Sequence, residues 1–181
     1  MKRKKIFPIL LAIWPYIIMV PSLFEDEIMQ VLLYLYFPLT LVVYVWNVIN
    51  AFRYKGEDTV KELAFYNMVV KIVHIPFYLG VFLVGAVFLM ASVVPALVLV
   101  TPMVLIYLII TDVILLVVSS MYGVNAIRNA YKAGKITAKS AVKNLIMHFI
   151  FVFDVISAIH IYCKVRKISK GNEKGGSYDQ Y

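Results

Sequence analysis

Apolar residues run along this chain in five long blocks, and a short polar or turn-forming segment separates each block from the next. Each block approaches or exceeds the roughly 20 residues that a helix needs to cross a hydrocarbon layer of about 30 Å. Because backbone N–H and C=O groups must be paired internally in lipid, segments this apolar are expected to be helices. The blocks span residues 6–24, 28–52, 64–90, 97–122 and 145–163.

Two of the linkers carry signals that end one helix and begin the next. Gly56 is expected to stop the second helix, and Asp58 or Thr59 to cap the N-terminus of the third. Gly134 and Thr137 are expected to take the same two roles between the fourth block and the fifth. The fourth helix should therefore continue past the lipid, turn at Gly134 and lead into the fifth block.

The two ends of the chain differ in character. The N-terminal block begins with basic residues, as a signal peptide does, but prolines and bulky aromatic residues interrupt it and no small-residue cleavage pattern follows. It is expected to be retained as the first span. Residues 1–168 are expected to form a single helical membrane domain, and the polar, glycine-rich residues 169–181 a disordered tail.

Composition supports a membrane protein and removes several other classes. Hydrophobic residues make up 62% of the 181 residues and the mean hydropathy is +0.85, whereas soluble domains contain about 45–50% apolar residues. The net charge of +8 comes from basic residues at the ends of the blocks, where they suit anionic headgroups and form no stripe for nucleic acid. The single Cys163 excludes an internal disulfide and a cysteine-cluster metal site.

The placement of lysine and arginine predicts a topology for the first four blocks. The positive-inside rule puts the basic N-terminus (residues 2–5), the linker with Arg53 and the linker with Arg128 in the cytoplasm. The charge-free turn at residues 91–97 then lies outside. A fifth crossing would place the basic tail outside as well, which breaks the rule.

Two folds are compatible with this pattern. The preferred fold is an all-α, polytopic transmembrane bundle of five membrane helices, because apolar residues nearly encircle the fifth block. The alternative has four spans plus one interfacial or re-entrant helix, with the tail in the cytoplasm. Asp154 favours the alternative, since an aspartate at the centre of a spanning helix costs about 2.5–3.5 kcal/mol.

A polar stripe interrupts the third block. Asn67, Lys71, His74 and Tyr78 are spaced i, i+4, i+7 and i+11, so they lie within about 60° of one another on a helix. The ordinary explanation is that Lys71 extends its ammonium group to the headgroups and that His74 is a neutral, hydrogen-bonded histidine. Pro76 should kink the helix just beyond the stripe.

Two aspartates lie deep in the fourth and fifth blocks, and a charged aspartate in lipid must be paired, protonated or hydrated. Asp112 and Asp154 are expected at similar depths, with Ser157 three residues after Asp154 and His148 nearer the cytoplasmic end. With the stripe, these residues form a candidate intramembrane polar network. It is expected either to hold the helices together or to carry a proton- or cation-coupled site; the full set is Asn67, Lys71, His74, Tyr78, Asp112, His148, Asp154 and Ser157.

No catalytic motif is present. The chain lacks HExxH and ExxH metal-binding pairs, and no histidine lies beside the Ser119–Ser120 pair in the sequence. Convergence of His74, His148 and Asp154 on a metal remains a possible arrangement. The expectation is a protein that is not an enzyme, with no catalytic residue, no cofactor and no metal.

Three stretches carry a resemblance to a known family. "LAFYNMVVKIVHIPFY", "SSMYG" and "FVFDVISAI" resemble a family of small bacterial integral membrane proteins of unknown function. The similarity extends from the first span to about Lys164. It implies a bacterial cytoplasmic membrane, and it brings no activity, substrate or cofactor.

The sequence therefore predicts a small polytopic protein of the bacterial cytoplasmic membrane, with its N-terminus in the cytoplasm. The preferred role is structural or accessory; the alternative is a proton- or cation-coupled transporter or a channel-like protein that uses Asp112 and Asp154. The expected partners are the lipid bilayer and either a partner membrane protein or a second copy of the chain, with no nucleic acid.

Overall fold

The computed structural model describes residues 2–18, 27–56, 59–150 and 153–175, and in these residues it is helical without strands. The fold is therefore all-α, as the sequence predicts. The helices are α1 (Lys2–Ile17), α2 (Glu27–Phe52), α3 (Val60–Ala91), the 3₁₀ turn η3 (Pro95–Leu97), α4 (Val100–Lys132), α5 (Ala138–Met147) and α6 (Phe153–Gly175).

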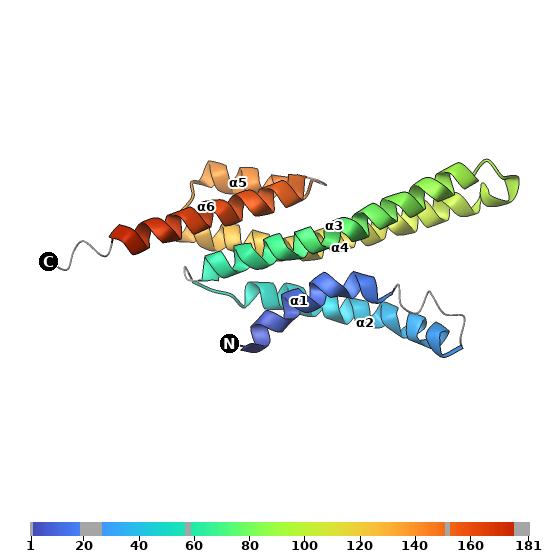
Figure 1. The fold of residues 1–181 in the computed structure, drawn as a ribbon, viewed down its shortest axis with the longest axis horizontal. Coiled ribbons are helices and arrows are strands. Elements are labelled where there is room, and N and C mark those ends of the chain that lie inside the picture. Colours follow the sequence, from blue (N-terminus) through green and yellow to red (C-terminus); the bar gives the residue numbers. More distant parts are fainter. Residues whose placement is uncertain (1, 19–26, 57–58, 151–152, 176–181) are drawn as a thin grey trace.

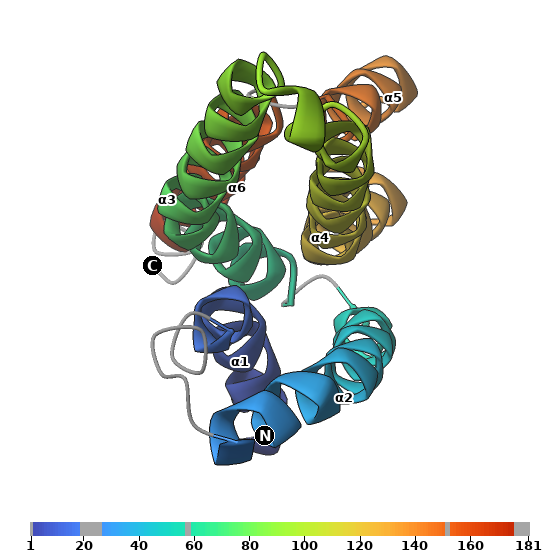
Figure 2. The same cartoon turned by 90° about the vertical axis from the view of Figure 1, so that its right-hand side faces the viewer.

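Three antiparallel pairs make up the fold (Figure 1). The long α3–α4 hairpin forms the centre; α1 and α2 pack against one side of it, and the short α5–α6 hairpin packs against another, as Figure 2 shows end-on. α3 contacts α1 and α6, while α4 contacts α2 and α5. The start of α1, the end of α6 and the described parts of the charged α2–α3 and α4–α5 linkers lie at one end of the molecule, here called the basic end (Figure 1).

The apolar surface of these helices identifies a membrane protein. Among the described residues, three helical segments are long and apolar enough to cross a bilayer: Gln30–Phe52, Val60–Ala91 and Val100–Lys132. The apolar part of α1, Ile6–Ile17, is shorter than these three. Large hydrophobic side chains cover the outer faces; Met103, for example, is 73% exposed. In water such a surface would aggregate, whereas in lipid it is solvated.

The structure does not support five continuous spans. The fifth block is broken: α5 ends at Met147, a turn follows at residues 148–150, residues 151–152 lie outside the described part, and α6 begins at Phe153. Figure 1 shows the α5–α6 hairpin reaching only part of the way along α3 and α4 before it returns to the basic end. The hairpin places the basic C-terminal end of α6 at the same end as the other basic linkers.

The structure confirms the predicted signals of the α4–α5 linker, whereas those of the α2–α3 linker are confirmed only in part, since α2 already ends at Phe52, before Gly56. Gly56 and Gly134 both have positive φ, +96° and +68°, which glycine adopts without strain. Thr137 caps α5, since its hydroxyl accepts a bond from the amide of Ser140. Thr59 stands at the N-cap position of α3, but its side chain makes no capping bond to the helix; its hydroxyl donates instead to the carbonyl of Gly56. Asp58 lies outside the described residues. α6 includes residues 169–175 of the segment expected to be disordered; residues 176–181 are outside the described part.

Buried side chains gather near the basic end. The core joins residues of α1, α2, the first half of α3, the second half of α4 and α6, including Leu11, Ala51, Leu63 and Tyr122. By contrast, Thr101 is the one buried side chain between residues 78 and 114, all of which the structure describes. The far half of the α3–α4 hairpin therefore faces its surroundings on almost every side, while the polar residues lie within the packed half.

Candidate functional site

Lys71 of α3 lies at the centre of a buried polar cluster. Its ammonium group forms an ion pair with Asp154 of α6, and the two side chains are 0% and 3% exposed. The same nitrogen donates to the hydroxyl of Ser120 at 2.8 Å and to the carbonyl of Leu116 at 3.4 Å, both on α4. Lys71 therefore does not extend to the headgroups; its three donors are used inside the protein by two different helices.

Ser120 connects this cluster to the turn of the α5–α6 hairpin. Its hydroxyl accepts from Lys71 and lies 3.0 Å from the carbonyl of His148 and 2.7 Å from that of Leu116. Ser157, one turn after Asp154 on α6, donates to the carbonyl of Asn144 on α5 at 3.4 Å. Ser157 thus ties the two arms of the hairpin to each other, and Ser120 ties the hairpin to α4.

His148 fits into a space that only glycine leaves open. Its Nε2 accepts a bond from the side-chain amide of Asn67 at 3.2 Å, and the imidazole is fully buried. A Cβ atom at Gly123 of α4 would lie 2.1 Å from Nε2 of His148 and 2.9 Å from Cγ of Asn67. The imidazole therefore lies against the backbone of α4, and Gly123 is what permits the hairpin to dock.

His74 points to α1 and is separate from the ion pair. Its Nε2 donates to the carbonyl of Leu11 at 3.1 Å. That carbonyl lacks its usual helical partner because Pro15, four residues later in α1, has no N–H. His74 thus supplies the hydrogen bond that Pro15 cannot, which explains a buried histidine at this position. Tyr16 adds a second link, from its hydroxyl to the carbonyl of Val73.

Asp112 is not joined to the cluster. It is half-buried on the far half of α4, and its Oδ1 is shielded without a hydrogen-bond partner in the described chain. No ion pair between Asp112 and Lys71 occurs in the structure, so Lys71 pairs with Asp154 alone of the two aspartates. Tyr78 of α3 lies beside Ser119 of α4.

The eight predicted residues therefore separate into groups. Asn67, Lys71, His148 and Asp154 meet directly at the turn of the α5–α6 hairpin, here called the hairpin latch together with Ser120. Ser157 lies next to the latch, whereas His74, Tyr78 and Asp112 lie outside it. Within the described residues no group of histidine, cysteine and carboxylate side chains could hold a metal, so His74, His148 and Asp154 do not converge on one.

A second polar seam joins α2 to α4, and sequence reasoning missed it. The Tyr122 hydroxyl donates to Oδ1 of Asn47 at 3.0 Å and accepts from Nδ2 of Asn50 at 3.1 Å. One turn further along α4, the amide of Asn125 donates to the carbonyls of Ala51 at 2.7 Å and Tyr54 at 2.9 Å. The sequence signal for this seam is the pair Asn47 and Asn50, spaced i, i+3 in an apolar helix. The predicted network did not include it because that prediction was built on ionisable residues.

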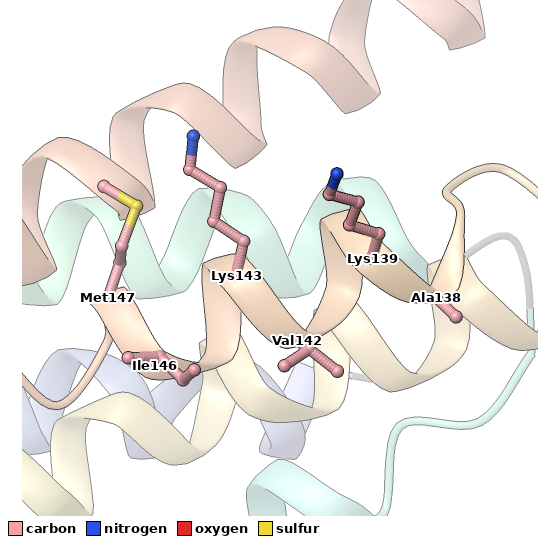
Figure 3. A pocket seen from close by; sticks show the side chains of 6 residues that line it. All are labelled: Ala138, Lys139, Val142, Lys143, Ile146 and Met147. Carbon is pink, nitrogen blue, oxygen red and sulfur yellow. The ribbon is translucent and has the colours of Figure 1, made fainter.

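Two cavities lie away from the latch. One, of about 570 Å³, is an open groove on the outer face of α5. Figure 3 shows Lys139 and Lys143 on one side of this groove and Val142 and Ile146 on the other. The second, of about 280 Å³, lies between the end of α2, the α2–α3 linker and the end of α4. Neither of these two cavities is lined by a latch residue.

Comparison with known proteins gives a family without an assigned role. A family model described as a family of unknown function (DUF6652) matches residues 5–167 of the chain. No curated protein and no solved structure matches the chain. The match agrees with the resemblance seen in the sequence, and the membrane character rests on the apolar helices.

Proposed function

Because the chain belongs to DUF6652, a family whose function is unknown, we propose a role from its own geometry: it is a structural or accessory protein of the bacterial cytoplasmic membrane. In this role the hairpin latch holds α5 and α6 in a fixed position, and the basic end they help to form presents a rigid surface to a partner membrane protein or to a second copy of the chain.

The observation that carries this proposal is the complete use of the Lys71 ammonium group. All three donors meet fixed acceptors on α4 and α6, and the pair with Asp154 is shielded from solvent. A cation that is part of a transport path must exchange partners, whereas a cation with three fixed partners holds elements together. The latch is therefore better suited to fastening the hairpin than to moving an ion.

The distribution of charge supports the proposed topology. The N-terminus, the linkers and the C-terminal segment carry the basic residues and lie at one end of the fold (Figure 1). With a re-entrant hairpin, the positive-inside rule is satisfied throughout if this end faces the cytoplasm. The proposal therefore includes a cytoplasmic N-terminus and a cytoplasmic C-terminal segment.

Co-purification tests the accessory role. After solubilisation in a mild detergent, the wild-type chain is expected to bring down one membrane protein, or a second copy of itself, in fixed stoichiometry. Asp154→Asn keeps the shape of the side chain but removes the counter-ion of Lys71, and it is expected to loosen the hairpin and lose that complex while the chain stays helical. Recovery of the wild type as a lone monomer, or an unchanged complex with the variant, would contradict the proposal.

One observation favours the alternative of proton or cation coupling. Asp112 lies mid-way along α4 with a shielded Oδ1 that has no partner in the described residues, and intramembrane carboxyl groups often mark ion paths. If this alternative holds, the protein reconstituted in vesicles dissipates an imposed pH or cation gradient, and Asp112→Asn abolishes the flux. Absence of flux in the wild-type vesicles eliminates the alternative and leaves the accessory role untouched.

A further inference from the structure

The cavity of about 280 Å³ at the basic end is surrounded by cations. Lys55 approaches from the α2–α3 linker, and Arg128 and Lys132 project from the same face of α4 at i, i+4 spacing. None of the three makes an ion pair with any carboxylate in the described ranges. Three like charges around one space repel one another, so the chemistry that complements the cavity is an anion.

The wall of the cavity is pre-formed by two asparagines. Asn125, which is buried, donates to the carbonyls of Ala51 and Tyr54, and Asn129 donates to the carbonyl of Tyr54 at 3.2 Å. These bonds fix the course of the linker immediately before Lys55, and Gly56 then turns with its positive φ. The cations are therefore placed around the cavity by the fold itself, which lowers the ordering cost of binding.

The cavity lies where a membrane protein meets lipid headgroups. α2 ends at Phe52 and α4 ends at Lys132, and both residues line it. The ends of spans lie at the headgroup layer, where basic pockets between helices bind acidic lipids. Its volume is near the lower end of the about 300–1,000 Å³ of ligand pockets, which suits a headgroup and not acyl chains. Exposed Val45 and Ile49 continue the apolar surface along α2 from Phe52.

We propose that this cavity binds the phosphate group of an anionic phospholipid, with its acyl chains along the outer face of α2. The Arg128 guanidinium presents a fork of N–H donors that matches two phosphate oxygens, and Lys55 and Lys132 supply further positive charge. The proposal needs only the membrane location of the helices and does not depend on the accessory role.

The α5 groove provides a matched control. Lys139 and Lys143 are also exposed, also spaced i, i+4 and also near the basic end, but one helix alone lines their groove. Neutralising them removes the same charge as neutralising Arg128 and Lys132, without touching the cavity. A general attraction between a basic protein and acidic lipid would be weakened equally by either change.

The experiment is native mass spectrometry of the full-length protein, released from detergent with phosphatidylglycerol and phosphatidylcholine as competing lipids. The wild type and Lys139→Gln/Lys143→Gln are expected to retain phosphatidylglycerol preferentially. Arg128→Gln/Lys132→Gln is expected to lower that preference about tenfold or more, since both charged donors of α4 to the phosphate group are removed.

Three results would overturn the proposal: an unchanged preference in Arg128→Gln/Lys132→Gln, an equal loss in the two double variants, or displacement of the bound lipid by inorganic phosphate, which would assign the cavity to a free anion. Lys55→Gln is the second variant. Lys55 is exposed on the linker, so its predicted loss of phosphatidylglycerol stays measurable if the α4 variant does not fold.

Discussion

Replacing Lys71 with methionine is the most direct test of the hairpin latch. Methionine keeps most of the length and apolar volume of the lysine but removes the charge, so Asp154 is left buried without a cation and Ser120 loses a donor. Both partners of the pair are almost fully shielded, and solvent screening therefore does not reduce the effect. Breaking a buried ion pair from one side costs about 3–5 kcal/mol, because the remaining charge is uncompensated.

The expected result is a loss of about 3 kcal/mol in the free energy of unfolding, at the lower end of that range because polar contacts in membrane proteins are worth less on average than in water. Reversible unfolding in mixed micelles, followed by circular dichroism as the denaturing detergent is titrated, measures it. Amide hydrogen exchange shows which helices are loosened: protection from exchange should fall in α6 and be retained in the far half of α3 and α4.

Two further variants make this reasoning refutable. Lys71→Met/Asp154→Leu removes both charges and is expected to recover most of the loss, since an apolar pair of similar volume replaces a buried ion pair at little or no cost. Lys61→Met, on the exposed face of the same helix, is the matched control and should change stability by less than about 1 kcal/mol. A loss in Lys71→Met no larger than that of the control, or no recovery in the double variant, would refute the latch.

Three other predictions follow from the packing. Gly123→Ala should destabilise the protein by at least about 2 kcal/mol in the same unfolding assay, because the new Cβ overlaps the imidazole of His148. The control is Gly80→Ala, whose Cβ meets nothing within 4 Å and which should be neutral or stabilising. His74→Leu should lower the free energy of unfolding by about 1–3 kcal/mol, because it leaves the carbonyl of Leu11 unpaired. Adding Pro15→Ala restores the missing N–H and should recover most of that loss; no recovery would contradict the pairing. Paired topology reporters fused after Lys167 should show activity of the cytoplasmic reporter alone, and activity of the external reporter would restore the fifth span.

Local patterns predicted most of the helices. The apolar blocks locate α1 to α4, and Gly134 and Thr137 mark the turn into α5, because caps and positive φ angles depend on a few neighbouring residues. The polar stripe on α3 also predicted that Asn67 and Lys71 face the interior, since i, i+4 spacing fixes a common face of a helix.

The break in the fifth block was not predictable from its local sequence. Residues 148–153 contain no glycine or proline, and their aromatic and β-branched side chains suit a continuous apolar helix. The turn forms there because it places His148 against Gly123 and Asp154 against Lys71, which are contacts with other helices. Two sequence signals argued against a continuous fifth span: the cost of Asp154 in a spanning helix, and the basic tail, which a fifth crossing would have put on the wrong side.

The sequence-based prediction also left out most of the uncharged polar residues that are buried between helices. Asn47, Asn50 and Asn125 are buried as deeply as Lys71, yet an amide in an apolar helix attracts less notice than a charge. Ser120 was predictable only as one of two adjacent serines, since the choice between Ser119 and Ser120 depends on how α4 is rotated against α3. Side-chain pairing between helices requires that rotation, and a single sequence does not fix it.

The position of the latch within the chain sets an order of biogenesis. Lys71 is synthesised early, and Ser120 follows on α4, but the counter-ion is supplied by Asp154 near the C-terminus. Until α6 arrives, the nascent chain holds an uncompensated cation among apolar helices, a state that is costly in lipid. The α5–α6 hairpin, which is synthesised after the α3–α4 hairpin, thus supplies the counter-ion of Lys71. A chain truncated before α6 is therefore expected to be degraded.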